Sequence, residues 1–461
     1  MRRRTAHAAA AIAGGGALLL WPAFLNGYPL VFSDTSAFLE QTAAAGLLAW
    51  DKPVVYGPLL HAFHWHLCLW PAAAAQALLL SWLLWRTGRM LGRRAEAGAH
   101  LLLVAGLCTF TAAPWFASLL MPDALAPGLV LAVALLGWGD PRPWERAALL
   151  LVAALAAAAH LAHLPLLAAL LLVLAVARRW RGLRDGTLAL GAALALVVAT
   201  NAAFHGRVAV SPYGAVFALA RLVADGPAAR TVEERCPEAG WHLCRWAGRL
   251  QTDSDEFLWS PDGPVWAPRP DGAASPRGPV GLAQEAEAIL RETLAREPWG
   301  VLRAAAANTV RQLLTVQIGD TLGPQHLRES VARALTRSFP AAESRRFAAS
   351  LQFRGALPAV AAPFLWPHLP VLLAGALALP LMFRRAWQGG DSALLGFLLC
   401  AAVGVLANAA VLGALSGPHD RYGARMAWLL PLAGLLALRR RRGVIAAAGR
   451  PTPIAIGSAA L

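Results

Sequence analysis

Long stretches without Asp, Glu, Lys or Arg constrain the fold of this sequence more than any other feature. They occupy residues 5–33, 53–85, 97–122, 124–139, 147–177, 187–206, 355–383, 392–419 and 426–438. A charge at the centre of a bilayer costs roughly 2.5–3.5 kcal/mol, and a helix needs about 20 apolar residues to cross the hydrocarbon. The runs therefore predict an all-α polytopic membrane protein.

Short blocks rich in Arg separate these runs and set the expected orientation. The blocks lie at 2–4, 86–94, 142–146, 178–184, 384–385 and 439–442. Basic residues favour the cytoplasmic side, so placing all these blocks there gives about ten crossings with both termini in the cytoplasm. The run 147–177 must then cross out and back, which predicts two short helices joined at a turn over 160–163.

The predicted spans form two groups around a polar middle. Residues 1–204 make the first membrane part, with a long outer loop at 26–69, and residues 355–461 make the last helices and a cytoplasmic tail. Residues 205–354 are expected outside, because long loops translocate largely regardless of charge. Amphipathic patterns in this segment predict helices at 281–297, 300–317 and 325–352.

The charge balance excludes several classes of function. Only 15% of the 461 residues are charged, against about 25% in soluble domains, and the net charge of +15 comes from the Arg blocks between apolar runs. We therefore expect no nucleic-acid partner, which would need a basic face on a soluble domain. Phosphate-binding loops, nucleotide fingerprints and metalloprotease motifs do not occur. Abundant Ala, Leu, Gly and Arg, with Lys52 as the single Lys, favour a GC-rich bacterial gene. Together with the predicted spans, this composition predicts a bacterial inner-membrane protein.

Two ambiguities concern the N-terminus and the cysteines. The basic start and apolar run also fit a signal peptide, but no small-residue cleavage site follows before Asn26, so we expect an uncleaved first span. Cys236 and Cys244 lie together in the polar segment and predict a disulfide there. The remaining cysteines lie in apolar runs, where they act as small packing residues.

Charged residues at the outward ends of predicted spans are the candidates for chemistry. Asp34 directly follows the first run, where a carboxylate is costly unless it is solvated or used; it can also cap a helix over 35–48. Asp123 ends the third run, and is either a site acid or an ordinary loop acid or cap. Arg421 and Arg425 precede the last run, and can either bind an anion or anchor that helix by snorkelling.

Histidines accompany these charges. His61, His64 and His66 follow the first outer loop, and His61 and His64 share a helical face. They can bind metal or phosphate, but the preferred interpretation is anchoring of an interfacial helix. The same interpretation applies to His160, His163 and His419.

Four features resemble the GT-C superfamily of polyprenyl-phosphate-sugar-dependent glycosyltransferases, particularly protein mannosyltransferases and aminoarabinose transferases. They are the acid after the first span (Asp34), the acid-Lys-Pro-x-x-Tyr run from Asp51 to Tyr56, the Arg421-Tyr422 pair with Pro431 following, and the plan of many helices with a soluble outer part. The sequence departs from the family at Thr35, where many members have a second acid. The central position of the segment 205–354 is also unusual for it.

The resemblance implies transfer of a sugar from a polyprenyl-phosphate donor to a lipid, glycan or protein acceptor on the outer face. It implies that Asp34 is the catalytic acid of the first outer loop. The residues expected to bind the donor phosphate or substrate are Lys52, Tyr56, Arg421, Tyr422 and Arg425, with Asp51 and Asp123 as candidates for a second acid. A carboxylate such as Asp34 can accept the acceptor's proton or hold a divalent metal ion.

These expectations converge on a single outer cleft. The loop 26–69, Asp123, the turn at 160–163 and the stretch 419–425 should line it together, because each lies at an outward end of a span. Two other classes stay open, a transporter or flippase of a lipid-linked glycan and a non-catalytic envelope assembly protein. Transporters often carry internal repeats and ionisable residues near the midplane, and neither is evident in the predicted spans.

Overall fold

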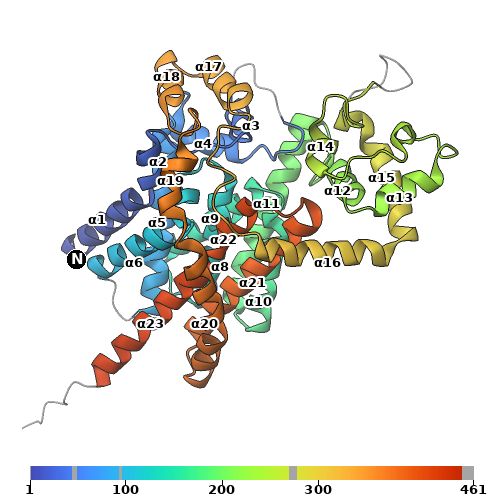
Figure 1. Ribbon diagram of the computed structural model, residues 1–461. Coiled ribbons are helices and arrows are strands. Elements are labelled where there is room, and N and C mark those ends of the chain that lie inside the picture. The colour runs from blue at the N-terminus through green and yellow to red at the C-terminus, as the bar shows by residue number, and fades with distance from the viewer. Residues whose placement is uncertain (1, 44–48, 93–95, 269–277, 449–461) are drawn as a thin grey trace, which may run out of the picture.

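The computed structural model describes residues 2–43, 49–92, 96–268 and 278–448 (Figure 1). Throughout these ranges the regular elements are helices, and an isolated β-bridge joins Leu30 to Leu119. The predicted all-α class is therefore confirmed for the described residues. The tail expected after residue 448 and residues 44–48 of the first outer loop lie outside them.

The first part of the chain carries helices up to residue 205. They are α1 (Arg2–Leu19), α2 (Trp21–Asn26), α3 (Thr35–Glu40), α4 (Tyr56–His64), α5 (Trp70–Leu91), α6 (Ala97–Phe110), α7 (Ala113–Ser118), η1 (Pro122–Ala124), α8 (Leu125–Trp138), α9 (Pro143–Ala159), α10 (His163–Val176) and α11 (Trp180–His205). The two helices predicted in the run 147–177 are confirmed as α9 and α10. The helix expected over 35–48 is described only as the short α3.

The second part continues from residue 214. Its helices are α12 (Gly214–Ala224), α13 (Pro227–Arg235), η2 (His242–Trp246), α14 (Ser254–Trp259), α15 (Pro279–Arg296), α16 (Pro298–Leu314), η4 (Arg328–Ala332), α17 (Arg333–Ser338), α18 (Ala341–Ala349), α19 (Leu357–Leu365), α20 (His368–Gln388), α21 (Ser392–Leu415), α22 (Asp420–Ala427) and α23 (Leu429–Ala448). The prediction of one helix over 325–352 is wrong. The chain is extended at Phe339, because the residue before a proline avoids the helical region, and Pro340 starts a new helix.

Three helical stretches among the described residues are long and apolar enough to cross a membrane. They are Trp180–His205, Leu357–Gln388 and Ser392–Leu415. The run 97–122 does not form one long helix: α6 ends at Phe110, and Pro114 and Pro122 begin short new segments. About ten crossings therefore remain a prediction.

The main core is built around α8. Twelve of its fourteen residues, from Leu125 to Leu136, are buried. A helix that is apolar on every side lies either in lipid or among other helices, and α5, α9 and α21 surround α8 here. Helices α21 and α16 also pack closely: a Cβ on Gly413 would lie 2.6 Å from the carbonyl oxygen of Asn308.

The polar middle of the chain divides between two cores. Helices α12 to α15 enclose a separate apolar cluster that includes Val216, Phe257 and Ile289, and we call this part the satellite unit. Figure 1 shows it gathered at one end of α16, away from α1, α5 and α6. After α16 the chain returns to the main core, where the buried Glu343 accepts hydrogen bonds from the Tyr28 hydroxyl at 2.7 Å and the Leu69 amide at 2.9 Å.

Three of the Arg blocks meet at one place. Arg86 forms a buried ion pair with Glu145, joining the start of α9 to α5. Arg146 Nε lies 2.5 Å from Asp185 Oδ2 on α11. The guanidinium of Arg179 lies 5.5 Å from the Trp138 ring at the end of α8. The helix ends that carry the blocks 86–94, 142–146 and 178–184 therefore lie together, as a common side of the membrane would require.

Candidate functional site

Two neighbouring cavities form a cleft between the main core and the satellite unit. One has a volume of about 550 Å³ and is mostly apolar; we call it the apolar chamber. The other has a volume of about 620 Å³; apolar atoms make up most of its lining too, but Ser254, Asp255, Glu256 and Asp320 border it, and we call it the polar chamber after these residues. They share a wall of Asp34, Asp51, Lys52, Phe217, Leu415, Ser416, Arg421 and Tyr422. The charges of the first outer loop and of α22 thus lie at the junction.

The first outer loop contributes a Lys between two carboxylates. Lys52 Nζ lies 3.4 Å from Asp34 Oδ2 and forms a closer ion pair with Asp51. Burial alone would lower the pKa of Lys52, but the charges of Asp34 and Asp51 outweigh it and raise that pKa above its usual value. Lys52 is therefore a fixed cation. A divalent metal ion bound by Asp34 and Asp51 would have to displace its ammonium group.

Asp34 is the more exposed of the two carboxylates that pair with Lys52. Its side chain is 34% exposed, against 6% for Asp51. Asp34 stands at the N-cap position of α3, yet its carboxylate accepts no capping hydrogen bond from the helix. The capping role considered for Asp34 from the sequence is therefore not what its side chain does. The carboxylate faces the cleft instead, where both chambers reach it.

On the other wall, two arginines of α22 share one buried acid. Asp123 Oδ1 lies 3.1 Å from Arg425 Nη1 and 3.7 Å from Arg421 Nε. Arg425 is completely buried and also holds Asn408 Oδ1 with two nitrogens, at 2.9 and 3.2 Å. Arg425 therefore supports α22, whereas Arg421 borders both chambers.

Arg421 is held with one nitrogen free of hydrogen bonds. Its guanidinium lies 4.3 Å from the Phe32 ring, and Nη2 donates to the Tyr422 hydroxyl at 3.3 Å. Nη1 is buried and has no hydrogen-bond partner. An unpaired buried donor costs about 1–3 kcal/mol, and an anionic ligand at the junction would give it a partner.

The segment after α16 positions the start of α22. The Arg421 amide donates to Asp320 Oδ2 at 2.8 Å, and the Gln317 amide donates to Asp420 Oδ1 at 2.8 Å. Gln312 bonds the backbone of His419 through both ends of its side-chain amide, at 2.9 Å each. Sequence reasoning missed these residues, because partners about a hundred positions apart leave no local pattern.

The structure brings most of the predicted site residues together. Asp34, Asp51, Lys52, Asp123, His160, Arg421 and Tyr422 all border the cleft. Arg425 does not, and neither does Tyr56, whose hydroxyl donates to Gln76 Oε1 at 2.9 Å and whose ring packs 5.0 Å from Phe38. Tyr56 therefore supports the loop from inside the core. Cys236 and Cys244 form the disulfide expected from the sequence and lie in the satellite unit.

An aromatic wall was also missed from the sequence. Trp50 of the first outer loop stacks on Phe217 of α12, with ring centroids 4.8 Å apart, and lies 5.6 Å from Trp259 of α14. These rings border the cleft and fasten the loop to the satellite unit. The only signal in the sequence is the composition of the stretch around Trp259, where acids stand beside aromatics, as they do on many carbohydrate-binding surfaces.

Comparison of the chain with protein-family models, curated proteins and solved structures found no match. Its function must therefore be argued from the geometry of the cleft and from the chemistry of the side chains that border it.

Proposed function

We propose that this chain is a membrane glycosyltransferase that moves a sugar from a polyprenyl-phosphate donor to an acceptor on the extracytoplasmic face. The observation that carries the proposal is the meeting of an apolar and a polar chamber at Asp34, Lys52 and Arg421. A lipid-linked sugar is apolar at one end, anionic at the middle and polar at the other end. The cleft has the same sequence of environments: the apolar chamber, the charged residues at the junction, and the polar chamber.

The apolar chamber suits the lipid chain. Leu161 and Leu164 from the α9–α10 hairpin, Leu194 of α11, and Val411 and Leu412 of α21 form its walls. Two of these helices, α11 and α21, are long and apolar enough to cross a membrane. A polyprenyl chain arriving through the bilayer would exchange lipid contacts for these side chains at little cost.

The junction suits the phosphate. Arg421 Nη1 is unpaired, and Lys52 keeps its charge beside Asp34. When the bond between the anomeric carbon and the phosphate oxygen breaks, the electron pair stays on the leaving polyprenyl phosphate. Fixed cations placed where this charge develops stabilise the transition state more than the ground state.

Asp34 suits the acceptor. Its partly exposed carboxylate borders the polar chamber, where water-borne or lipid-borne hydroxyl and amino groups can reach it. As a general base it takes the proton from the acceptor while the acceptor oxygen or nitrogen bonds to the anomeric carbon. Thr35, which stands where many GT-C members have a second acid, is buried and bonds to the Leu120 carbonyl at 3.1 Å. The second carboxylate in this chain is Asp51, which shares Lys52 with Asp34.

The proposal places this chain in the bacterial inner membrane with its cleft on the outer side. In an 18-residue apolar window of each of the stretches Trp180–His205 and Leu357–Gln388, only 22% of the residues are buried inside the protein, which leaves wide apolar surfaces that suit lipid rather than water. With the Arg blocks in the cytoplasm of a bacterial cell, about ten crossings place the cleft on the outer side of the inner membrane and both termini inside.

The test is turnover of a defined donor. The purified full chain, reconstituted in lipid, receives a polyprenyl phosphate carrying a radiolabelled sugar, and release of polyprenyl phosphate is followed with and without candidate acceptors. We expect transfer or slow hydrolysis, and a loss of about 100-fold or more in Asp34→Asn. Asp140→Asn, at an exposed acid away from the cleft, is the matched control. Folded Asp34→Asn with full activity would refute the mechanism, and movement of the donor across the bilayer without cleavage would favour a flippase.

A further inference from the structure

We propose that His61, His64 and His66 form a binding site for a divalent transition-metal ion, with Zn²⁺ as the expected occupant, which fastens the end of α4 to the chain after α3. The site is separate from the cleft, because none of the three histidines borders either chamber. It therefore stands whether or not the chain transfers sugars.

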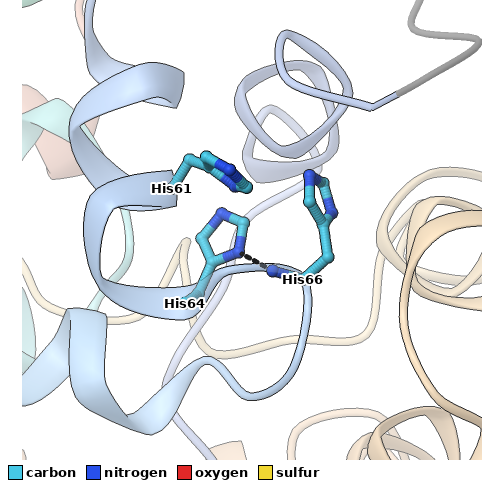
Figure 2. A group of neighbouring side chains, drawn as sticks. All are labelled: His61, His64 and His66. Atoms are coloured by element: carbon cyan, nitrogen blue, oxygen red, sulfur yellow. Dashed lines mark hydrogen bonds between the residues drawn. The ribbon is translucent and has the colours of Figure 1, made fainter.

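The three rings face a common space (Figure 2). One ring nitrogen of each histidine lies within 4.8 Å of one from each of the other two. Ring centroids are 5.2 Å apart for His61 and His64, 4.7 Å for His61 and His66, and 5.1 Å for His64 and His66. Nitrogens around a tetrahedral Zn²⁺ lie about 3.4 Å apart, since each Zn–N bond is about 2.1 Å. Side-chain rotations would bring the nitrogens to that spacing.

Each ring offers a nitrogen that nothing else uses. His61 Nδ1, His64 Nε2 and His66 Nδ1 are buried and have no hydrogen-bond partner. Buried polar atoms in proteins normally have partners. Each ring of the cluster therefore has a nitrogen that a cation with a preference for imidazole could satisfy.

The surroundings of His66 have the form expected around a metal ligand. Its Nε2 lies 3.2 Å from the Thr42 carbonyl oxygen, so the Nε2 hydrogen is donated there and Nδ1 keeps its lone pair. The Thr42 hydroxyl lies 3.2 Å from the same nitrogen. Ligating histidines commonly donate their second ring nitrogen to a carbonyl or carboxylate, which fixes the tautomer and the ring orientation.

His64 is arranged differently. The His66 amide donates to His64 Nδ1 at 2.9 Å, the dashed line in Figure 2, so the hydrogen of the neutral ring is on Nε2. Binding through Nε2 moves this hydrogen to Nδ1 and breaks that bond. This ring must therefore reorient when the ion enters, whereas His66 needs no change of tautomer.

The backbone after α4 adopts an unusual conformation that brings the three histidines together. Trp65 and His66 follow α4 with φ of 48° and 56°, a left-handed conformation that non-glycine residues adopt rarely. This double turn brings His66 back over the last turn of α4, beside His61 and His64. Such conformations persist where surrounding contacts over-determine them, and they concentrate at functional sites. Phe339, with centroids 5.2 Å from His64 and 5.1 Å from His66, closes the cluster from the side of α17.

The chemistry of the donors selects the ion. Within the described residues the group holds three imidazoles and no carboxylate, which favours Zn²⁺, Cu²⁺ or Ni²⁺ over Mg²⁺ and Ca²⁺, which prefer oxygen. Zn²⁺ needs four ligands, so water fills the fourth position. The ion would join the end of α4 to Thr42, and hence hold the two sides of the loop that carries Asp34 and Lys52.

The test uses the full chain, purified without a polyhistidine tag and stripped with a chelator. Co²⁺ is the optical probe, because a site of low coordination number gives intense visible bands, and Zn²⁺ should displace it at one ion per chain. His61→Ala and His66→Ala should each weaken binding by at least about 100-fold. His7→Ala, at an exposed histidine of α1, should bind as the wild type does. Asp34→Asn should also bind normally, which separates this site from the cleft.

Two outcomes would overturn the proposal. One is a wild-type chain that takes up no Co²⁺ or Zn²⁺ at micromolar concentration. The other is a pair of His variants that bind the ion as tightly as the wild type. If the variants fold poorly, Zn²⁺ must still raise the melting temperature of the wild type in detergent, and a wild type with an unchanged melting temperature also counts against the site.

Discussion

Arg425 Nη1 donates to Asp123 Oδ1 at 3.1 Å, although the two residues are 302 positions apart and both are buried. This pair joins the turn before α8, which is buried along most of its length, to α22, which carries Arg421 into the cleft. Arg421 Nε lies 3.7 Å from the same carboxylate oxygen. One acid therefore neutralises two guanidinium groups, one of them structural and the other turned to the ligand space.

Asp123→Asn should destabilise the protein strongly. The amide keeps the shape of the side chain but removes the counter-charge that the two buried arginines share, and breaking a buried ion pair costs about 3–5 kcal/mol. We expect a clear fall in the apparent melting temperature in detergent, measured by size-exclusion chromatography after heating. Asp140→Asn, at an exposed acid, should change stability by less than about 0.5 kcal/mol. Equal melting temperatures for the two variants would show that Arg425 does not depend on Asp123.

Lys52 should contribute to the reaction through its charge. In Lys52→Met the carboxylates of Asp34 and Asp51 lose the cation that lies between them, and the donor phosphate loses one of its partners. A charged hydrogen bond contributes about 1.5–3 kcal/mol, so kcat/KM for the lipid-linked donor should fall roughly 10- to 150-fold. Lys52→Arg keeps the charge and should retain more activity. If both variants turn over the donor equally well, the charge is not what matters.

The gathering of Asp34, Lys52, Asp123 and Arg421 could be predicted from the sequence, because each stands beside a charge-free run. Helices that end on the same side of a membrane bring such ends together. The roles of Tyr56 and Arg425 could not be predicted. Their partners Gln76 and Asn408 lie 20 and 17 positions away, inside apolar runs with no distinguishing pattern.

Other parts of the fold depend on tertiary contacts in the same way. The satellite unit has its own apolar cluster, but nothing in the amphipathic patterns of α12 or α15 says that they pack on each other rather than on the main core. The stacking of Trp50 on Phe217 joins residues 167 positions apart, and it creates one wall of the cleft. The break in the helix predicted over 325–352 could have been predicted from the sequence, because Pro340 stands at that point.

Topology can be tested independently of activity. If the Arg blocks are cytoplasmic, Ser36→Cys, two residues after Asp34, should react with a membrane-impermeant maleimide in intact spheroplasts, and Arg142→Cys should react only after lysis. Both are made in a chain whose free cysteines Cys68, Cys108 and Cys400 are replaced by Ala. Ser36 and Arg142 both have partly or fully exposed side chains, so lack of access would reflect the membrane. The reverse pattern would place the cleft in the cytoplasm and exclude a donor presented from outside.

The central claim is that the apolar chamber holds the lipid of a phosphate-linked donor, and photo-crosslinking tests it most directly. A polyprenyl phosphate with a diazirine in its first isoprene units is irradiated with the reconstituted full chain, and the adducts are mapped by mass spectrometry. We predict adducts at Leu161, Leu164, Leu194 and Leu412, which line the chamber, and their loss with excess unlabelled polyprenyl phosphate or in Arg421→Gln. Adducts confined to the exposed Leu373 and Leu377 of α20, unaffected by competitor, would contradict the account.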